Sequence, residues 1–263
     1  MTTAAGVWSE SPVDVAGLAI PVREGGVGIP LLVLPHDTGS PDWLPFHDAL
    51  AQRHRVVAPT LPGFDGAERP EWMRSVRDMA AVMHFLLDRL DQDRLGVVGL
   101  GFGGWLAAEM ATMNQSRFSR MALVNAAGLQ PDDGEILDQF LFGHEDFLRM
   151  GFHDPEKYSQ HFQGQPSVDQ LVQWDLNREM TARIAWKPYM YSQTLPMLLP
   201  EVRLPTLVVW GRENRVIPLS CGRQYAEALP DARLTIIDDA GQYLEIEQPQ
   251  ALAAAVSGFL AGG

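Results

Sequence analysis

Residues Gly99-Leu100-Gly101-Phe102-Gly103-Gly104 form a glycine-rich turn between two segments of different character. The apolar run Leu95 to Val98 precedes the turn, and the helix-like run Trp105 to Met113 follows it. A short, wholly apolar run is typical of a strand that is buried on both faces of a parallel sheet. The order strand, sharp turn, helix therefore predicts an α/β architecture around this turn.

The composition limits the classes of protein and partner that need to be considered. With 263 residues, of which 46% are hydrophobic, the chain is long enough for one α/β domain with a large core. Its 33 acidic and 20 basic residues give a formal net charge of −13, which argues against nucleic acid and anionic lipid as partners. Residues 1–11 lack the features of a signal peptide, and no run is long enough to span a membrane, so we expect a cytoplasmic protein. The sequence leaves open whether the protein forms a homo-oligomer.

Short apolar runs alternate with helical patterns on both sides of the glycine-rich turn, which predicts a doubly wound, mostly parallel sheet. An edge hairpin is expected at the start of the chain, with its turn at Gly25-Gly26-Val27-Gly28. Ser75 and Asp78 have the spacing of a capping box, which predicts a helix start there. Besides residues 95–98, strands are expected over 30–34, 55–58, 120–124, 206–210 and 233–237, and helices over 43–53, 75–90, 220–229 and 249–260.

Residues 131–199 interrupt this alternation. They hold no short buried strand, but they are rich in Met, Trp, Phe and Tyr, with helical spacing over 137–150 and 168–186. We therefore predict a helical cap over residues 131–199, inserted into a core that comprises residues 1–130 and 200–263.

Several motifs along the chain resemble those of the α/β-hydrolase superfamily, in particular the capped bacterial hydrolases similar to carbon-carbon bond hydrolases and small esterases. The resemblance covers nearly the whole chain and implies that the glycine-rich turn is the nucleophile elbow of this fold. Besides the turn, the motifs are Pro62-Gly63-Phe64, Arg69-Pro70-Glu71-Trp72, Asn177-Arg178-Glu179, Trp186-Lys187-Pro188-Tyr189, Pro205 through Gly211 and Glu247-Gln248-Pro249.

Members of this superfamily that hydrolyse use a serine, an acid and a histidine in that chain order. The resemblance maps these three positions onto Gly101, Asn214 and Gln242, none of which can perform the corresponding step. The last of the seven histidines is His161, and no Ser or Cys occurs between residues 95 and 111, so a shift of the alignment does not restore the triad. We therefore predict a degenerate triad and a protein that is not a serine hydrolase.

The loop after the first buried strand, Leu34-Pro35-His36-Asp37-Thr38-Gly39, also departs from the pattern that the resemblance implies for an oxyanion-binding loop. Asp37 brings a carboxylate to the place where negative charge would develop, and two like charges about 4 Å apart repel by about 4 kcal/mol at an effective dielectric of about 20. His36 and Asp37 are instead candidates for a relocated acid/base unit. The alternative is that Asp37 caps a turn and His36 is a solvated loop residue.

The remaining expectations concern ligands. Aromatic residues of the elbow and the cap predict an apolar pocket for a small molecule, lined by Phe102, Trp105, Trp186, Tyr189 and Tyr243. His144, His153 and His161 are expected to be solvated surface residues, so no metal and no cofactor is predicted. Two classes of function follow. The first is a biosynthetic enzyme with non-hydrolytic, cofactor-independent chemistry of the lyase, isomerase or cyclase type; the second is an inactive pseudo-hydrolase that binds a ligand or a partner. Hydrolysis by activated water is a third, less favoured alternative.

Overall fold

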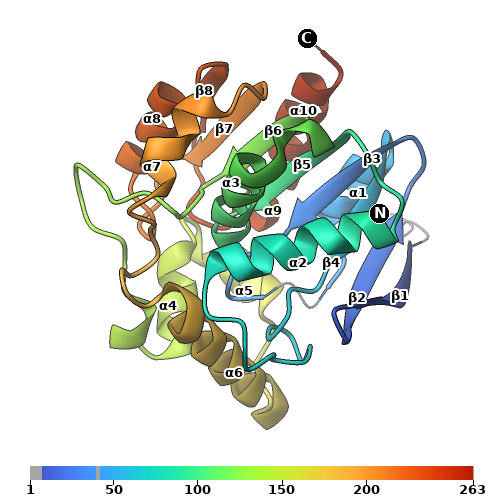
Figure 1. Ribbon diagram of the computed structural model, residues 1–263. Coiled ribbons are helices and arrows are strands. Elements are labelled where there is room, and N and C mark those ends of the chain that lie inside the picture. Colours follow the sequence, from blue (N-terminus) through green and yellow to red (C-terminus); the bar gives the residue numbers. More distant parts are fainter. Residues whose placement is uncertain (1–7, 40–41, 263) are drawn as a thin grey trace.

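The computed structural model describes residues 8–39 and 42–262, and its centre is an eight-stranded sheet (Figure 1). Along the sheet the strands follow the order β1-β2-β4-β3-β5-β6-β7-β8. β2 is antiparallel to both β1 and β4, whereas all neighbouring pairs from β4 to β8 are parallel. The predicted α/β class with a mostly parallel sheet is confirmed. The strands are β1 (Trp8–Val15), β2 (Leu18–Gly25), β3 (Ile29–Leu34), β4 (His54–Pro59), β5 (Leu95–Leu100), β6 (Phe118–Val124), β7 (Thr206–Gly211) and β8 (Ala232–Ile237).

Helices cover both faces of the sheet (Figure 1). Alternate side chains of β3 point to opposite faces, as the two-residue period of a strand requires. Leu32 and Leu34 belong to the core that α2, α3 and α8 complete, and Leu31 and Val33 belong to the core beneath α1 and α10. The helices are α1 (Pro45–Ala51), α2 (Val76–Arg89), α3 (Phe102–Asn114), α4 (His144–Gly151), α5 (Pro155–His161), α6 (Val168–Ala185), α7 (Leu195–Leu198), α8 (Leu219–Ala228), α9 (Leu244–Glu247) and α10 (Pro249–Leu260).

The edge hairpin is present, but its turn differs from the prediction. Ala16 and Gly17 both have positive φ, 54° and 81°, and they connect β1 to β2 in a two-residue turn. The expected hairpin turn at Gly25-Gly26-Val27-Gly28 is wrong, because Gly25 ends β2, where it is paired with both Trp8 and Val56, and residues 26–28 connect β2 to β3, which are not neighbours in the sheet. An alanine rarely adopts positive φ, so Ala16-Gly17 carries a weak turn signal.

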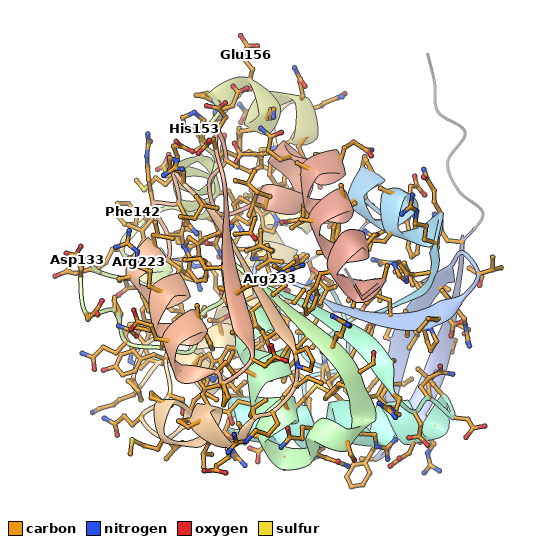
Figure 2. All side chains as sticks on the ribbon, turned by 90° about the horizontal axis from the view of Figure 1, so that it is seen from above. Asp133, Phe142, His153, Glu156, Arg223 and Arg233 are labelled. Carbon is orange, nitrogen blue, oxygen red and sulfur yellow. The ribbon has the colours of Figure 1, made fainter. Side chains whose placement is uncertain are left out.

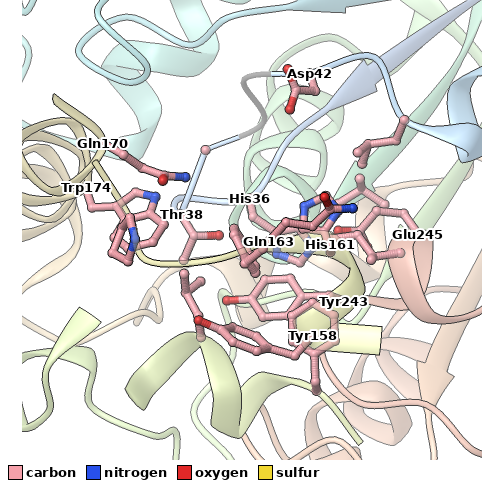
Figure 3. Close-up of a pocket in the computed structure, with 18 of the residues that line it drawn as sticks. His36, Thr38, Asp42, Tyr158, His161, Gln163, Gln170, Trp174, Tyr243 and Glu245 are labelled. Carbon is pink, nitrogen blue, oxygen red and sulfur yellow. Dashed lines mark ion pairs between the residues drawn. The ribbon is translucent and has the colours of Figure 1, made fainter. Parts of the chain in front are cut away.

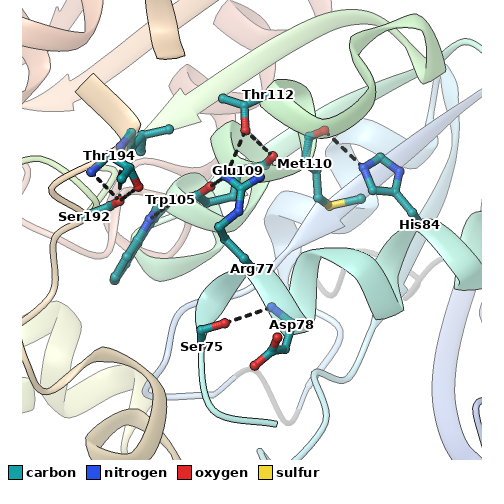
Figure 4. Close-up of polar contacts among 11 residues, drawn as sticks. Ser75, Arg77, Asp78, His84, Trp105, Glu109, Met110, Thr112, Ser192 and Thr194 are labelled. Carbon is teal, nitrogen blue, oxygen red and sulfur yellow. Dashed lines mark hydrogen bonds and ion pairs between the residues drawn. The ribbon is translucent and has the colours of Figure 1, made fainter. Parts of the chain in front are cut away.

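Helices α2 and α3 are joined by a buried polar contact (Figure 4). The carboxylate of Glu109 is 1% exposed, and it accepts hydrogen bonds from Arg77 at 2.6 Å and from the indole Nε1 of Trp105 at 3.2 Å. At the start of α2, Ser75 Oγ accepts the backbone N–H of Asp78 at 3.1 Å, so the predicted helix start at Ser75 is confirmed. A buried carboxylate that keeps both donors stabilises the packing of the two helices.

A helical insertion, defined here as residues 125–205, leaves the carboxyl end of β6 and returns to β7. It contains α4, α5, α6 and α7, and Figure 1 shows α4, α5 and α6 grouped beyond one end of the sheet. The first helix, α4, begins later than predicted, and α5 was not predicted. Side chains such as Glu156 of α5 and Arg223 of α8 project outward from the surface (Figure 2). Among the described residues, no helix has the length and apolarity to cross a bilayer.

Candidate functional site

Gly101 occupies the sharp turn between β5 and α3, with φ 52° and ψ −112°. Its N–H donates to the carbonyl of Val124 at 2.9 Å, and its own carbonyl accepts the N–H of Gly104 and of Ala127, each at 3.0 Å. Glycine at position 103 is also required, because a Cβ there would lie 2.3 Å from the carbonyl oxygen of Leu34. The turn is therefore held by backbone contacts to two neighbouring strands, which fixes the position above Gly101.

The imidazole of His36 fills the space above Gly101. A Cβ built on Gly101 would lie 2.2 Å from Nδ1 of His36 and 2.9 Å from Nε2 of Gln242, both closer than nonbonded atoms approach. His36 is 5% exposed and comes from the loop that follows β3. The expectation that His36 is a solvated loop residue is therefore wrong, and the place of a nucleophile's side chain is occupied by a ring.

The side chains of Gln242 and Asn214 are hydrogen-bonded to each other beside this position. Asn214 Nδ2 donates to Gln242 Oε1 at 2.7 Å, and Gln242 Nε2 donates to the carbonyl of Asn125 at 3.3 Å. Asn214 Oδ1 in turn accepts the backbone N–H groups of residues 216 and 217. The structure thus brings Gly101, Gln242 and Asn214 together, but neutral amides neither accept nor release protons near neutral pH.

The titratable partner of His36 is Glu245, in the short helix α9. His36 Nε2 lies 3.3 Å from Glu245 Oε1, and the carboxylate is 3% exposed. The edge of the ring also contacts Tyr243, with centroids 5.1 Å apart. Sequence reasoning missed Glu245. The available signal was an acidic residue three positions after Gln242, in the segment that follows the last strand.

Asp37 turns toward the helical insertion and away from this pair. Its Oδ2 accepts hydrogen bonds from Gln139 Nε2 at 2.8 Å and from Thr181 Oγ1 at 3.5 Å. Burial raises the pKa of the Asp37 carboxyl, and these donors oppose the shift. His36 and Asp37 make different side-chain contacts, although a Coulombic interaction with His36 also lowers the pKa of Asp37 and both residues line the same hollow of about 10 Å³.

A cavity of about 270 Å³ lies between the sheet and the helical insertion (Figure 3). His36, Tyr243 and Glu245 line it from the core, and aromatic side chains line it from the insertion. Figure 3 shows His36, His161 and Glu245 close together at one part of the wall, with Tyr158 and Tyr243 below them. The insertion's aromatic lining comprises Phe152, Tyr158, Phe162 and Trp174.

The five residues that were expected to line an apolar pocket lie in different places. Tyr243 lines the 270 Å³ cavity, whereas Tyr189 lines a hollow of only about 10 Å³ beside Asp37. Phe102 and Trp105 are buried in the core on one face of the sheet. Trp186 is 48% exposed and contacts Phe140 edge to face. Phe102, Trp105, Trp186 and Tyr189 are not among the described residues that line the larger cavity.

The histidines of the insertion were expected to be solvated, and for His144 this is wrong. His144 is buried, its ring stacks on Trp174 with centroids 4.6 Å apart, and burial lowers its pKa to about 4. His161 lines the cavity, and burial lowers its pKa as well. His153 is partly exposed. Within residues 8–39 and 42–262, no group of three or more His, Cys, Asp or Glu side chains is arranged to hold a metal ion.

Comparison with known proteins agrees with this architecture. A model of the alpha/beta hydrolase family matches residues 31–255. The 2-hydroxymuconate semialdehyde hydrolase of a Pseudomonas species is 28% identical over 94% of this chain and 92% of its own length. The 2-hydroxy-6-oxo-2,4-heptadienoate hydrolase of Pseudomonas putida is 24% identical over 93% and 94% of the two chains.

Solved structures show the same fold. A meta-cleavage product hydrolase from Pseudomonas fluorescens superimposes with a TM-score of 0.76 at 23% identity, covering 96% of this chain and 97% of that one. A bacterial membrane phospholipase A superimposes with a TM-score of 0.79 at 24% identity, covering 97% and 86%. At these identities the likeness concerns the fold. Because the family model spans most of the sequence, the chain belongs to the alpha/beta hydrolase family.

Proposed function

We propose that this protein is a non-hydrolytic enzyme in which His36 and Glu245 transfer protons on a small, mainly apolar molecule bound in the 270 Å³ cavity. The observation that carries the proposal is the placement of the His36 ring, which fills the space above Gly101 and holds Nε2 at 3.3 Å from a buried carboxylate. An imidazole beside a carboxylate in a water-poor cavity is a common acid/base arrangement. Both groups line the cavity.

Hydrolysis through an acyl-enzyme is disfavoured by the residues around the elbow. Gly101 offers no nucleophile, and neither Gln242 nor Asn214 can take a proton from one. The buried carboxyl of Asp37 lies on the same loop as His36, where an oxyanion would need donors. Relatives are named as hydrolases, but these residues support a different reaction on the same fold.

Proton transfer without a cofactor is sufficient for eliminations, isomerisations and some cyclisations. In the proposed step, His36 accepts a proton from carbon or oxygen of the bound molecule, and Glu245 stabilises the imidazolium that forms. The electron pair left on the molecule forms a new π bond as a leaving group departs, or the imidazolium returns the proton at another atom of the same molecule. The aromatic side chains position the molecule at the His36–Glu245 pair, where partial shielding from water strengthens the interaction between these charges.

A nitro-substituted benzisoxazole tests this base without knowledge of the natural substrate. Removal of its ring proton breaks the N–O bond and releases a coloured cyanophenolate. We expect His36→Gln and Glu245→Gln each to lower kcat/KM by about 100-fold or more, in the range of general-base effects. His84→Gln is the matched control, because His84 lies on α2 and bonds to the carbonyl of Met110 at 3.0 Å, apart from the cavity lining. Equal rates in all three variants would contradict the assignment.

A ligand-binding protein without turnover is the second candidate. It is favoured by the neutral Asn214–Gln242 contact, which needs no proton transfer to be stable. In that case the benzisoxazole binds, but its conversion does not exceed that in buffer, and neither His36→Gln nor Glu245→Gln changes the rate.

A further inference from the structure

The cavity beside His36 has an unusual charge balance. Two carboxylates, Asp42 and Glu245, line it, and no Lys or Arg occurs among the lining residues that the structure describes. Arg23 lines an adjoining hollow of about 10 Å³, which Asp42 also lines, and is paired with Glu10 at 2.8 Å, so Glu245 is the carboxylate on which the charge argument depends. The titratable bases in the lining are histidines, His36 and His161, so the wall carries no permanently cationic side chain. A negatively charged ligand would therefore meet repulsion there.

Glu245 has one oxygen that no described residue serves as a hydrogen-bond donor. Oε1 faces the His36 ring, whereas Oε2 is buried without a partner. Buried carboxylate oxygens are nearly always paired, because removal of the charge from water is costly. His36 Nε2 likewise has no hydrogen-bond partner among the described residues, so the pair is not closed by a hydrogen bond. Because Glu245 lines the cavity, a rotation of its side chain would let a ligand N–H group supply the missing donor.

The opposite wall is aromatic. Tyr158, Phe162 and Trp174 come from α5, α6 and the loop between them, and Tyr243 comes from the core side. Figure 3 shows the side chains of Trp174, Tyr158 and Tyr243 around the same space. Aromatic faces attract cations, and a desolvated cation gains more from them than an exposed one. Aromatic walls and a buried carboxylate together form a typical site for an organic ammonium group.

We propose that the cavity binds a protonated organic amine with an apolar body about the size of one aromatic ring, with its ammonium group on Glu245. This inference deepens the proposed function, since it names the ligand class for the same cavity. It also separates this protein from relatives whose names specify a carboxylate, such as the heptadienoate hydrolase of Pseudomonas putida. An ammonium at the cavity wall pairs with the Glu245 carboxylate, which turns to present an oxygen to it.

Binding of three ligands with the same ring tests the charge preference: benzylamine, benzyl alcohol and benzoate, measured by calorimetry at pH 7 on the whole protein. We expect benzylamine to bind at least 10-fold more tightly than benzyl alcohol, and benzoate to bind more weakly than either. Glu245→Gln should remove the preference for the amine. Glu156→Gln is the matched control, because it removes one exposed carboxylate of α5 that does not line the cavity, and it should leave all three affinities unchanged.

Benzoate binding as tight as that of benzylamine, or no binding of any of the three ligands, would overturn the inference. An amine preference that persists in Glu245→Gln would also overturn it. If Glu245→Gln does not fold, the wild-type ligand series and Trp174→Leu, which should weaken benzylamine binding at least 3-fold, still decide the question. His36→Gln separates the two proposals: it should abolish conversion of the benzisoxazole but retain benzylamine binding, so each proposal fails on its own measurement.

Discussion

The contact between His36 and the turn at Gly101 predicts a specific coupling between two substitutions. In Gly101→Ala the new Cβ would lie 2.2 Å from Nδ1 of His36, and the ring cannot swing away freely because Glu245 and Tyr243 flank it. The alanine must also keep φ 52°. Both effects raise the free energy of the folded state.

The two effects have similar expected magnitudes. Forcing a non-glycine residue into this backbone conformation costs about 1–3 kcal/mol. Overpacking against the His36 ring costs a further 1–3 kcal/mol or so, which gives about 2–6 kcal/mol in total. His36→Ala removes the obstructing ring, so that in this background Gly101→Ala should cost the backbone part and the smaller overlap with Gln242 Nε2 at 2.9 Å. The coupling energy between the two sites is then about 1–3 kcal/mol.

Urea denaturation of the wild type, both single variants and the double variant measures this coupling as a double-mutant cycle. The control is Gly17→Ala, which also places an alanine at a positive φ, 81°, but at an open site where its Cβ would have no atom within 4 Å. Gly99→Ala is unsuitable as a control, because its Cβ would lie 2.2 Å from the backbone of Gly103. Gly17→Ala should show no coupling to His36→Ala. Additive effects of Gly101→Ala and His36→Ala, within about 0.5 kcal/mol, would refute the assigned position of the ring.

Two further substitutions test the buried titratable groups. Burial raises the pKa of Asp37 in the folded state above its unfolded value, so the folded state loses stability as the pH rises from the unfolded pKa through the folded one. Asp37→Asn should therefore be no more stable than the wild type at pH 3, and its stability relative to the wild type should increase at pH 7. Urea midpoints that move in the opposite direction would contradict this. The pKa of His144 falls to about 4 from 6.5, so the wild type should lose about 3 kcal/mol through this group as pH falls from about 6.5 to 4. His144→Phe can keep the stack on Trp174 and should lose less stability than the wild type between pH 7 and pH 4.5, as measured by urea denaturation at both pH values. Equal losses of stability in the variant and the wild type would exclude a buried neutral imidazole at position 144.

Most of the sheet could be predicted because its strands are signalled locally. The run before Gly101 is apolar at every position, as expected for a strand with neighbours on both sides and helices on both faces, and the structure buries all of β5. The hairpin turn at Ala16-Gly17 was missed because its conformation is set by pairing along β1 and β2 and not by the residue types in the turn.

The candidate site was less predictable, because its contacts join distant parts of the chain. His36 and Glu245 are separated by more than two hundred positions, and nothing in the sequence around either residue indicates the 3.3 Å approach. Adjacency in sequence favoured Asp37 as the partner of His36 instead. Successive side chains in an extended loop point in different directions, so neighbouring residues are poor candidates for a paired site.

The residues at the elbow depend on one another physically. A serine at position 101 would collide with His36, and a histidine at position 242 would need an acid at position 214 to hold its proton-bearing nitrogen. Asn214 and Gln242 instead satisfy each other as amides, while Asn214 Oδ1 accepts two backbone N–H groups. An ionised aspartate at position 214 could accept those same N–H groups but could not donate to Gln242 Oε1. Gln242 would have to turn its amide to donate to it, and would then lose its bond to the carbonyl of Asn125. A single substitution at position 101 or 214 should therefore destabilise the site unless the contacting residues at positions 36 and 242 change with it.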